Sequence, residues 1–148
     1  MSIDPQADII AFLRATPDLE GVLDTFALPG LTGRAVFRTE APEAYRPRPA
    51  PFVIVDPLQE GPRALGSFSS RTPMIDVAVR MYSLIRDEGD ERLADAAWRL
   101  HELLQSAPLT LTGAVLNDID CTIPEETETS APSIGGRRMT VRMLITPA

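Results

Sequence analysis

Residues 73–105, PMIDVAVRMYSLIRDEGDERLADAAWRLHELLQ, contain two apolar repeats in succession, which predict a strand followed by a helix. In the first part every second residue is apolar, as in a strand with one buried face: Ile75, Val77, Val79 and Met81. In the second part apolar residues recur every three or four positions, as along one side of a helix: Leu93, Ala96, Ala97, Leu100, Leu103 and Leu104. We expect this helix, at about residues 90–105, to pack on the sheet that contains the strand.

The flanking sequence predicts the other elements of one α+β domain that spans residues 1–148. Asp4 and Pro5 are typical of a helix cap and a first helical residue, and Thr16 is expected to cap a second, short helical piece. Apolar segments bounded by proline or glycine predict further strands at residues 34–38, 52–55, 109–111, 113–123 and 138–145. We therefore expect a mostly antiparallel or mixed sheet of about four or five strands, with the helices packed on one face.

The last two long segments are expected to pair as antiparallel strands joined by an acidic loop at residues 124–136. In the first of them, after a slip of the alternation near Asn117, the expected common side holds four residues: Val115, Ile119, Cys121 and Ile123. In the second, the expected inward side also holds four: Met139, Val141, Met143 and Ile145. The loop between them is polar and acidic, so we expect it to be solvated.

The composition excludes several classes of protein. The net charge is −7 and all 14 basic residues are arginine, so a basic surface for gripping nucleic acid is not expected. A single cysteine rules out an intrachain disulfide and a thiolate metal cluster. No apolar run approaches the roughly 20 residues that cross a bilayer, and the first residues lack the pattern of a signal peptide. We expect a soluble protein made in the cytoplasm, with no membrane partner.

No motif predicts an active site, a cofactor site or a metal site. His101 is the only histidine, and no cysteine, serine or carboxylate constellation accompanies it, so a position on the helix surface or boundary is the expected one. The acidic residues of 118–128 could gather a hard cation, but they lack the spacing and the turn glycine of a calcium loop. The glycines match neither a P-loop nor a dinucleotide fingerprint. We therefore expect no catalytic residue, no cofactor and no enzyme activity.

The order of these segments resembles that of a family of particle proteins. The resemblance depends on the apolar strand after a proline, APFVIV at 50–55, on the alternating strand IDVAVRMY at 75–82, and on the Ala/Leu-rich helix that follows. In this order, with a helical start and closing strands, the chain is similar over nearly its whole length to tail terminator or tail completion proteins. These belong to long-tailed phages and to phage-like particles such as gene transfer agents. The acidic loop carries no signature of the family.

The resemblance implies a structural virion protein at the head-proximal end of a tail, made in the host bacterial cytoplasm. Its copies would form a ring, commonly a homo-hexamer, that ends the tail tube and binds both the tube protein and the connector or stopper protein of the head. DNA would pass through the ring without specific binding, which suits an acidic chain. Two alternatives stay open: a head-completion or neck protein, and a small-ligand-binding α+β module.

Within this interpretation, the two longest loops and one tryptophan are the candidate contact sites. The loop at 58–72 is long for so small a domain, and such a loop is usually functional or mobile. The candidate contact residues are Arg63, Leu65, Phe68 and Arg71 in that loop, Glu125, Glu126, Glu128, Arg137 and Arg138 in or beside the acidic loop, and Trp98 on the helix. Trp98 could instead lie at the edge of the core, and either loop could be only a solvated connection.

Overall fold

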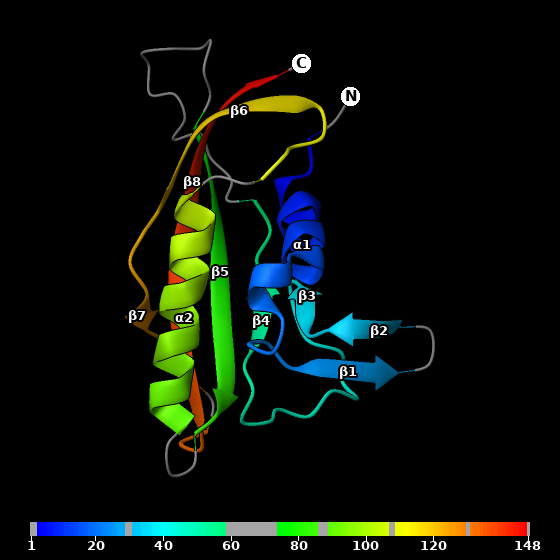
Figure 1. Ribbon diagram of the computed structural model, residues 1–148, viewed down its shortest axis with the longest axis vertical. Helices are drawn as coiled ribbons and strands as arrows, with labels where there is room; N and C mark the ends of the chain where they lie inside the picture. The colour runs from blue at the N-terminus through cyan, green and yellow to red at the C-terminus, as the bar shows by residue number, and fades with distance from the viewer. Residues whose placement is uncertain are drawn as a thin grey trace.

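Both α-helices lie on one face of a six-stranded mixed sheet (Figure 1). The computed structural model describes residues 3–28, 31–58, 74–85, 89–106, 109–129 and 131–147. The helical elements are α1 (Pro5–Ala15), the 3-10 turn η1 (Pro17–Leu19) and α2 (Gly89–Gln105). The α+β class and the packing of helices on one face are as expected, and the sheet is slightly larger than the predicted four or five strands.

The sheet has the order β3-β4-β5-β8-β6, with the short β7 also paired to β8. Its strands are β3 (Val36–Arg38), β4 (Phe52–Val55), β5 (Met74–Leu84), β6 (Ala114–Cys121), β7 (Glu125–Glu126) and β8 (Ile134–Pro147). The pair β3 and β4 is parallel, whereas every other pair is antiparallel. A separate hairpin of β1 (Thr25–Leu28) and β2 (Leu31–Arg34) projects beside β3 and β4 (Figure 1).

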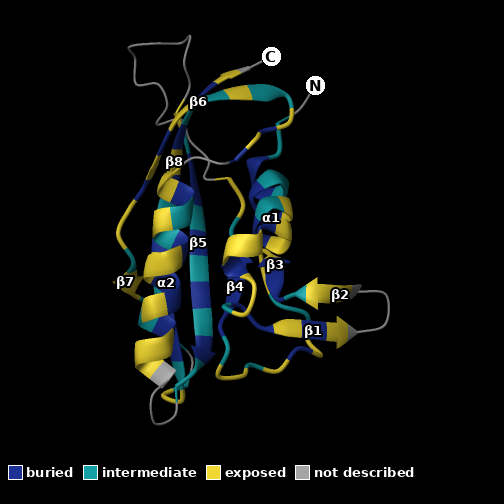
Figure 2. Ribbon diagram, in the orientation of Figure 1, coloured by how far each residue is buried: buried dark blue, intermediate teal, exposed yellow. Residues whose placement is uncertain are grey.

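The main core lies between the helices and the sheet. Val77, Val79 and Met81 are fully buried, which confirms the alternation predicted for β5, and Ile75 is half-buried beside them. Five residues of the predicted stripe on α2 are buried in the same core, namely Leu93, Ala96, Ala97, Leu100 and Leu104, while Leu103 packs at its margin. Figure 2 shows the buried side of α2 turned to the sheet and an exposed side turned away. The helix is thus held by its apolar face, as amphipathic helices are.

The start of α1 follows the predicted capping chemistry. Asp4 Oδ1 accepts a hydrogen bond from Ala7 N at 3.1 Å, and Pro5 occupies the first helical position. Thr16 ends α1 and caps η1, because its Oγ1 accepts from Asp18 N at 3.4 Å. Both predicted helical starts are therefore confirmed.

A second, smaller core of aromatic residues lies on the other face of β3 and β4. Phe37 packs edge-on against Phe26 and Tyr45 at ring-centroid distances of 5.0 Å, and Tyr45 packs on Phe52 at the same distance. The Tyr45 hydroxyl donates a hydrogen bond of 2.6 Å to Asp24 Oδ2, and both residues are buried. Strand β3 therefore separates two cores, with Val36 in the helix-side core and Phe37 in the aromatic one.

Two adjacent glycines in β8 leave room for side chains that lie against this strand. A Cβ added at Gly135 would lie 2.7 Å from Cγ2 of Ile85, on the side of α2. A Cβ added at Gly136 would lie 2.8 Å from Cγ2 of Thr127, on the other side of the strand. Real Cβ atoms essentially never come so near, so both positions require glycine.

Several predicted boundaries and faces are wrong. Residues 109–111 form no strand, although Leu109 and Leu111 are buried, and the predicted strand at 34–38 is divided between β2 and β3. The slip near Asn117 is confirmed as a register shift between Leu116 and Asp118. This shift places Val115 on the face opposite to the predicted one. Val115 is 57% exposed, whereas Ile119 and Cys121 are buried. Ile123 lies beyond the end of β6 and is also 57% exposed.

Candidate subunit interface

The acidic segment is not a free loop, because part of it pairs with the sheet. Glu125 and Glu126 form β7 and lie opposite Arg138 and Arg137 of β8 in antiparallel register. Thr127 N extends the pairing by donating to Gly136 O at 3.2 Å. Backbone hydrogen bonds thus fix the segment that its polar composition predicted to be solvated.

Arg137 joins β8, β7 and α2 on the helix side of the sheet. Its Nη2 lies 3.0 Å from Asp90 Oδ1 in the first turn of α2 and 3.8 Å from Glu126 Oε1. The Arg137 side chain is 11% exposed, whereas that of Glu126 is 81% exposed. Arg137 is therefore a residue that fixes the position of β7, and Glu126 remains accessible. Glu128 is exposed too and has no partner among the described residues.

The face of the sheet away from the helices is charged. Arg80 donates to both carboxylate oxygens of Asp56 at distances between 2.7 and 3.2 Å, and to the Tyr82 hydroxyl at 2.8 Å. These hydrogen bonds to Asp56, and next the one to Tyr82, raise the pKa of Arg80 against the opposing effect of burial. Arg138 is exposed on this face, between Arg80 and Glu125 in register. Arginine at such a position is a good partner for planar carboxylates.

Trp98 lies on the flank of α2 that faces the end of β6. Its indole is 46% exposed and meets the ring of His101 edge-on, with centroids 5.3 Å apart. His101 Nδ1 lies 3.1 Å from Thr122 O, and this hydrogen bond needs the proton on Nδ1 because a carbonyl only accepts. Trp98 is therefore not a core residue. It adds an exposed aromatic group near Ile123, the kind of side chain that anchors interfaces.

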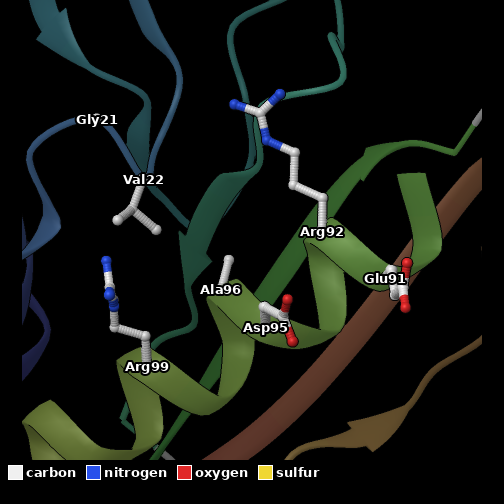
Figure 3. A pocket seen from close by; sticks show the side chains of 7 residues that line it. All are labelled: Gly21, Val22, Glu91, Arg92, Asp95, Ala96 and Arg99. Atoms are coloured by element: carbon white, nitrogen blue, oxygen red, sulfur yellow. The ribbon is translucent and has the colours of Figure 1, made fainter. Parts of the chain in front are cut away.

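A groove on the opposite flank of α2 was not predicted (Figure 3). It has a volume of about 590 Å³ and lies between α2 and the Gly21-Val22 segment that leads into β1. Arg92 and Arg99 extend from α2 toward that segment with Ala96 between them, while Glu91 and Asp95 also line the groove (Figure 3). We call this the arginine groove. The one sequence signal for it is the seven-residue spacing of the two arginines, which places them on one side of a helix.

The structure brings some of the predicted contact residues together. Glu125, Glu126, Arg137 and Arg138 are neighbours on β7 and β8, whereas Trp98 lies on α2 beside His101. The remaining candidates, Arg63, Leu65, Phe68 and Arg71, lie outside the described residues.

The part of the chain that the structure describes contains no cluster of side chains suited to catalysis or to metal binding. There, no cluster of three or more histidine, cysteine or acidic side chains could hold a metal ion. Burial, with a smaller effect of Asp120, raises the pKa of the Cys121 thiol to about 12, so the sulfur is a protonated core group and not a nucleophile. Neither described helix combines the length and the apolar content needed to cross a bilayer.

A solved particle structure has the same fold. The similar chain belongs to a structure described as "Virion of native gene transfer agent (GTA) particle". The TM-score is 0.68, the sequence identity is 15%, and the match covers 97% of this chain and 95% of that chain. At this identity the similarity establishes the fold alone. No protein-family model matches the sequence, and neither does any of the curated proteins compared with it.

Proposed function

We propose that this chain is a structural protein of a phage-like particle, whose copies form a ring that ends a tail tube and joins it to the head. The observation that carries the proposal is the match, end to end, between this fold and a chain of a gene transfer agent virion. Coverage of 97% and 95% means that the domain has no large additional part relative to that chain. The order of its sequence segments supports the same class of protein.

The surface chemistry is consistent with a protein that binds other proteins. The exposed carboxylates beside β7 and the arginine groove lie on opposite sides of α2, and exposed Trp98 does not line the groove. A closed ring needs two different surfaces on each copy, because each copy meets its two neighbours through unlike patches. This chain offers such a pair, and the proposed assembly is a homo-hexamer that also contacts the tube protein and a connector or stopper protein.

The acidic balance supports a passage for DNA that does not retain it. With a net charge of −7, a ring of several copies would repel phosphates and not release counterions from them. We therefore propose that DNA passes through the channel without sequence-specific contacts.

Deleting the gene from the particle's own cluster tests this function. We expect filled heads and separate tails of uncontrolled length, seen by negative-stain electron microscopy, and recovery of joined particles when the wild-type gene is supplied in trans. Trp98→Ala in the complementing gene should reduce joined particles, because it removes an exposed aromatic anchor. Normal joined particles in the deletion strain would refute the proposal.

The same experiment separates the nearest alternative, a head-completion or neck protein. Loss of a neck protein leaves tails of normal length with unstable heads, whereas loss of a terminator alters the tails themselves. A small-ligand-binding module has less support, since the arginine groove is open and charged and not enclosed and apolar.

A further inference from the structure

We propose that the arginine groove of one copy binds the acidic edge of a second copy, where the acidic edge is defined as Glu126 and Glu128. This inference rests on the proposed ring and names its contact between copies. Two arginines of the groove have no ion pair among the described residues, the edge carries exposed carboxylates, and the two surfaces lie on opposite flanks of α2.

The groove presents two guanidinium groups that have no partner among the described residues. Arg92 and Arg99 are exposed, and neither makes a hydrogen bond or ion pair in the described part of the structure. Both extend in the same direction on either side of the buried Ala96, opposite Val22 (Figure 3). A small apolar floor between two guanidinium groups suits an extended peptide with carboxylates, because arginine pairs with carboxylates through two parallel hydrogen bonds.

The acidic edge supplies exposed carboxylates that can pair with arginine. Glu126 and Glu128 are exposed, and Glu126 has only the long 3.8 Å contact to Arg137, whose nearer partner is Asp90. Pairing of β7 to β8 fixes the backbone as far as Thr127, and Glu128 follows one residue beyond that pairing. A pre-ordered strand loses little conformational entropy on binding.

The spacings of the two surfaces are compatible. Seven residues of helix separate the Arg92 and Arg99 backbones by about 10 Å, and two residues of strand separate Glu126 and Glu128 by about 7 Å. A change of rotamer in these long arginine side chains is enough to close the difference of about 3 Å between the two lengths. Glu91 and Asp95 also line the groove, so an incoming carboxylate must meet the guanidinium groups of Arg92 and Arg99 and not these two side chains.

The two surfaces cannot satisfy each other within one copy. In Figure 1, β7 lies to the left of α2, whereas β1, which follows the groove segment, lies to its right. A basic groove on one flank and an acidic edge on the other make a head-to-tail contact, which generates a closed ring when the rotation between copies is suitable.

Charge reversal on each side tests the contact with the full-length chain. The groove variant is Arg92→Glu/Arg99→Glu, and the edge variant is Glu126→Arg/Glu128→Arg. We expect each variant alone to lose the ring mass measured by native mass spectrometry, because its groove and edge then carry the same sign. An equimolar mixture should recover a ring in which the two variants alternate, so that it contains equal numbers of each.

Controls separate this contact from a general effect of charge. Arg46→Glu and Glu40→Arg/Glu43→Arg alter exposed charges that belong to neither the groove nor the acidic edge, and they should leave the ring intact. Circular dichroism checks folding, and the neutral pairs Arg92→Gln/Arg99→Gln and Glu126→Gln/Glu128→Gln replace any reversed variant that does not fold. The wild-type ring should also weaken between about 0.1 M and 1 M salt, as the Debye length falls from about 10 Å to about 3 Å.

The outcomes distinguish the contact from the proposed function. A wild-type ring that persists in either variant, or a mixture that fails to recover it, overturns the groove contact and leaves the ring function standing. Absence of any ring from the wild-type chain, with and without its tube protein, overturns both.

Discussion

Tyr45→Phe is the change that most directly tests the aromatic core. The Tyr45 hydroxyl donates to Asp24 Oδ2 at 2.6 Å in a buried site, and among the described residues the other partner of that carboxylate is Arg48, whose Nε lies 3.9 Å away. Burial, and then the bond to Asp24, raise the pKa of Tyr45 well above its ordinary value, so the hydroxyl remains a donor at all working pH values. Phenylalanine keeps the ring contacts with Phe37 and Phe52 and removes only the donor.

The expected cost follows from the charge on the acceptor. A hydrogen bond to a charged group contributes about 1.5–3 kcal/mol, and a buried acceptor that loses its donor pays its own desolvation. We therefore expect Tyr45→Phe to lower the free energy of unfolding by about 1.5–3 kcal/mol. For a chain of 148 residues this corresponds to a melting temperature lower by about 3–12 °C.

Urea unfolding followed by circular dichroism measures this difference, and a double-mutant cycle with Asp24→Asn assigns it to the pair. We expect a coupling free energy above about 0.5 kcal/mol, as found for residues in direct contact. A Tyr45→Phe protein within about 0.5 kcal/mol of the wild type would refute the reasoning, because the Asp24 carboxylate would then be satisfied without the hydroxyl.

Three further predictions concern other parts of the fold. Leu100→Ala should lower the free energy of unfolding by about 2–5 kcal/mol in urea unfolding, since Leu100 is fully buried between α2 and the sheet; a loss below about 1 kcal/mol would contradict that packing. The hydrogen bond from Ala7 N, with a smaller contribution from Arg38 and against partial burial, lowers the pKa of Asp4. The Asp4 carboxylate therefore stabilises the fold above its unfolded pKa of about 3.9 and stops doing so as the pH falls through the lower folded value. Asp4→Asn should accordingly be less stable than the wild type in thermal unfolding at pH 7 and equally stable in strong acid. A loss of stability that does not depend on pH would count against this assignment. Cys121, with its pKa raised to about 12, should resist a thiol reagent at pH 8 in the folded chain and react in urea; rapid reaction without urea would show that β6 opens.

The elements that the sequence predicted best are those in which the spacing of apolar residues determines both the type of element and its buried face. The alternation in β5 and the leucine stripe of α2 both follow from burial of one face, and both lie in the main core. The caps Asp4 and Thr16 were equally predictable, because their hydrogen bonds are local. The pairing of β6 with β8 followed from two long apolar segments joined by a polar one.

The remaining features depend on contacts between distant residues. The aromatic core joins Phe26, Phe37, Tyr45 and Phe52, which no local repeat connects. Strand β7 consists of two glutamates and forms through backbone hydrogen bonds, which leave no pattern in the side chains. The bulge before Asp118 reversed the expected side of Val115, because a shift of one residue moves a side chain to the other face.

The candidate interface was only partly predictable for the same reason. The acidic residues and Trp98 stand out in the sequence by charge and by size. The arginine groove does not, because one wall of it comes from Gly21 and Val22, about seventy positions before α2. The spacing of Arg92 and Arg99 marks one side of the helix, but it does not indicate that a distant segment lies opposite.

The glycine pair in β8 has a consequence for how this protein can change over generations. Gly135 leaves room for Ile85 on one side of the strand, and Gly136 leaves room for Thr127 on the other. A side chain added at either position would clash with that neighbour. Compensation for a larger residue would need simultaneous shortening of a side chain on a neighbouring segment. Lineages that descend from this sequence should therefore keep both glycines even where most of the surface has drifted, and a saturation library at these two codons should return almost only the parental pair.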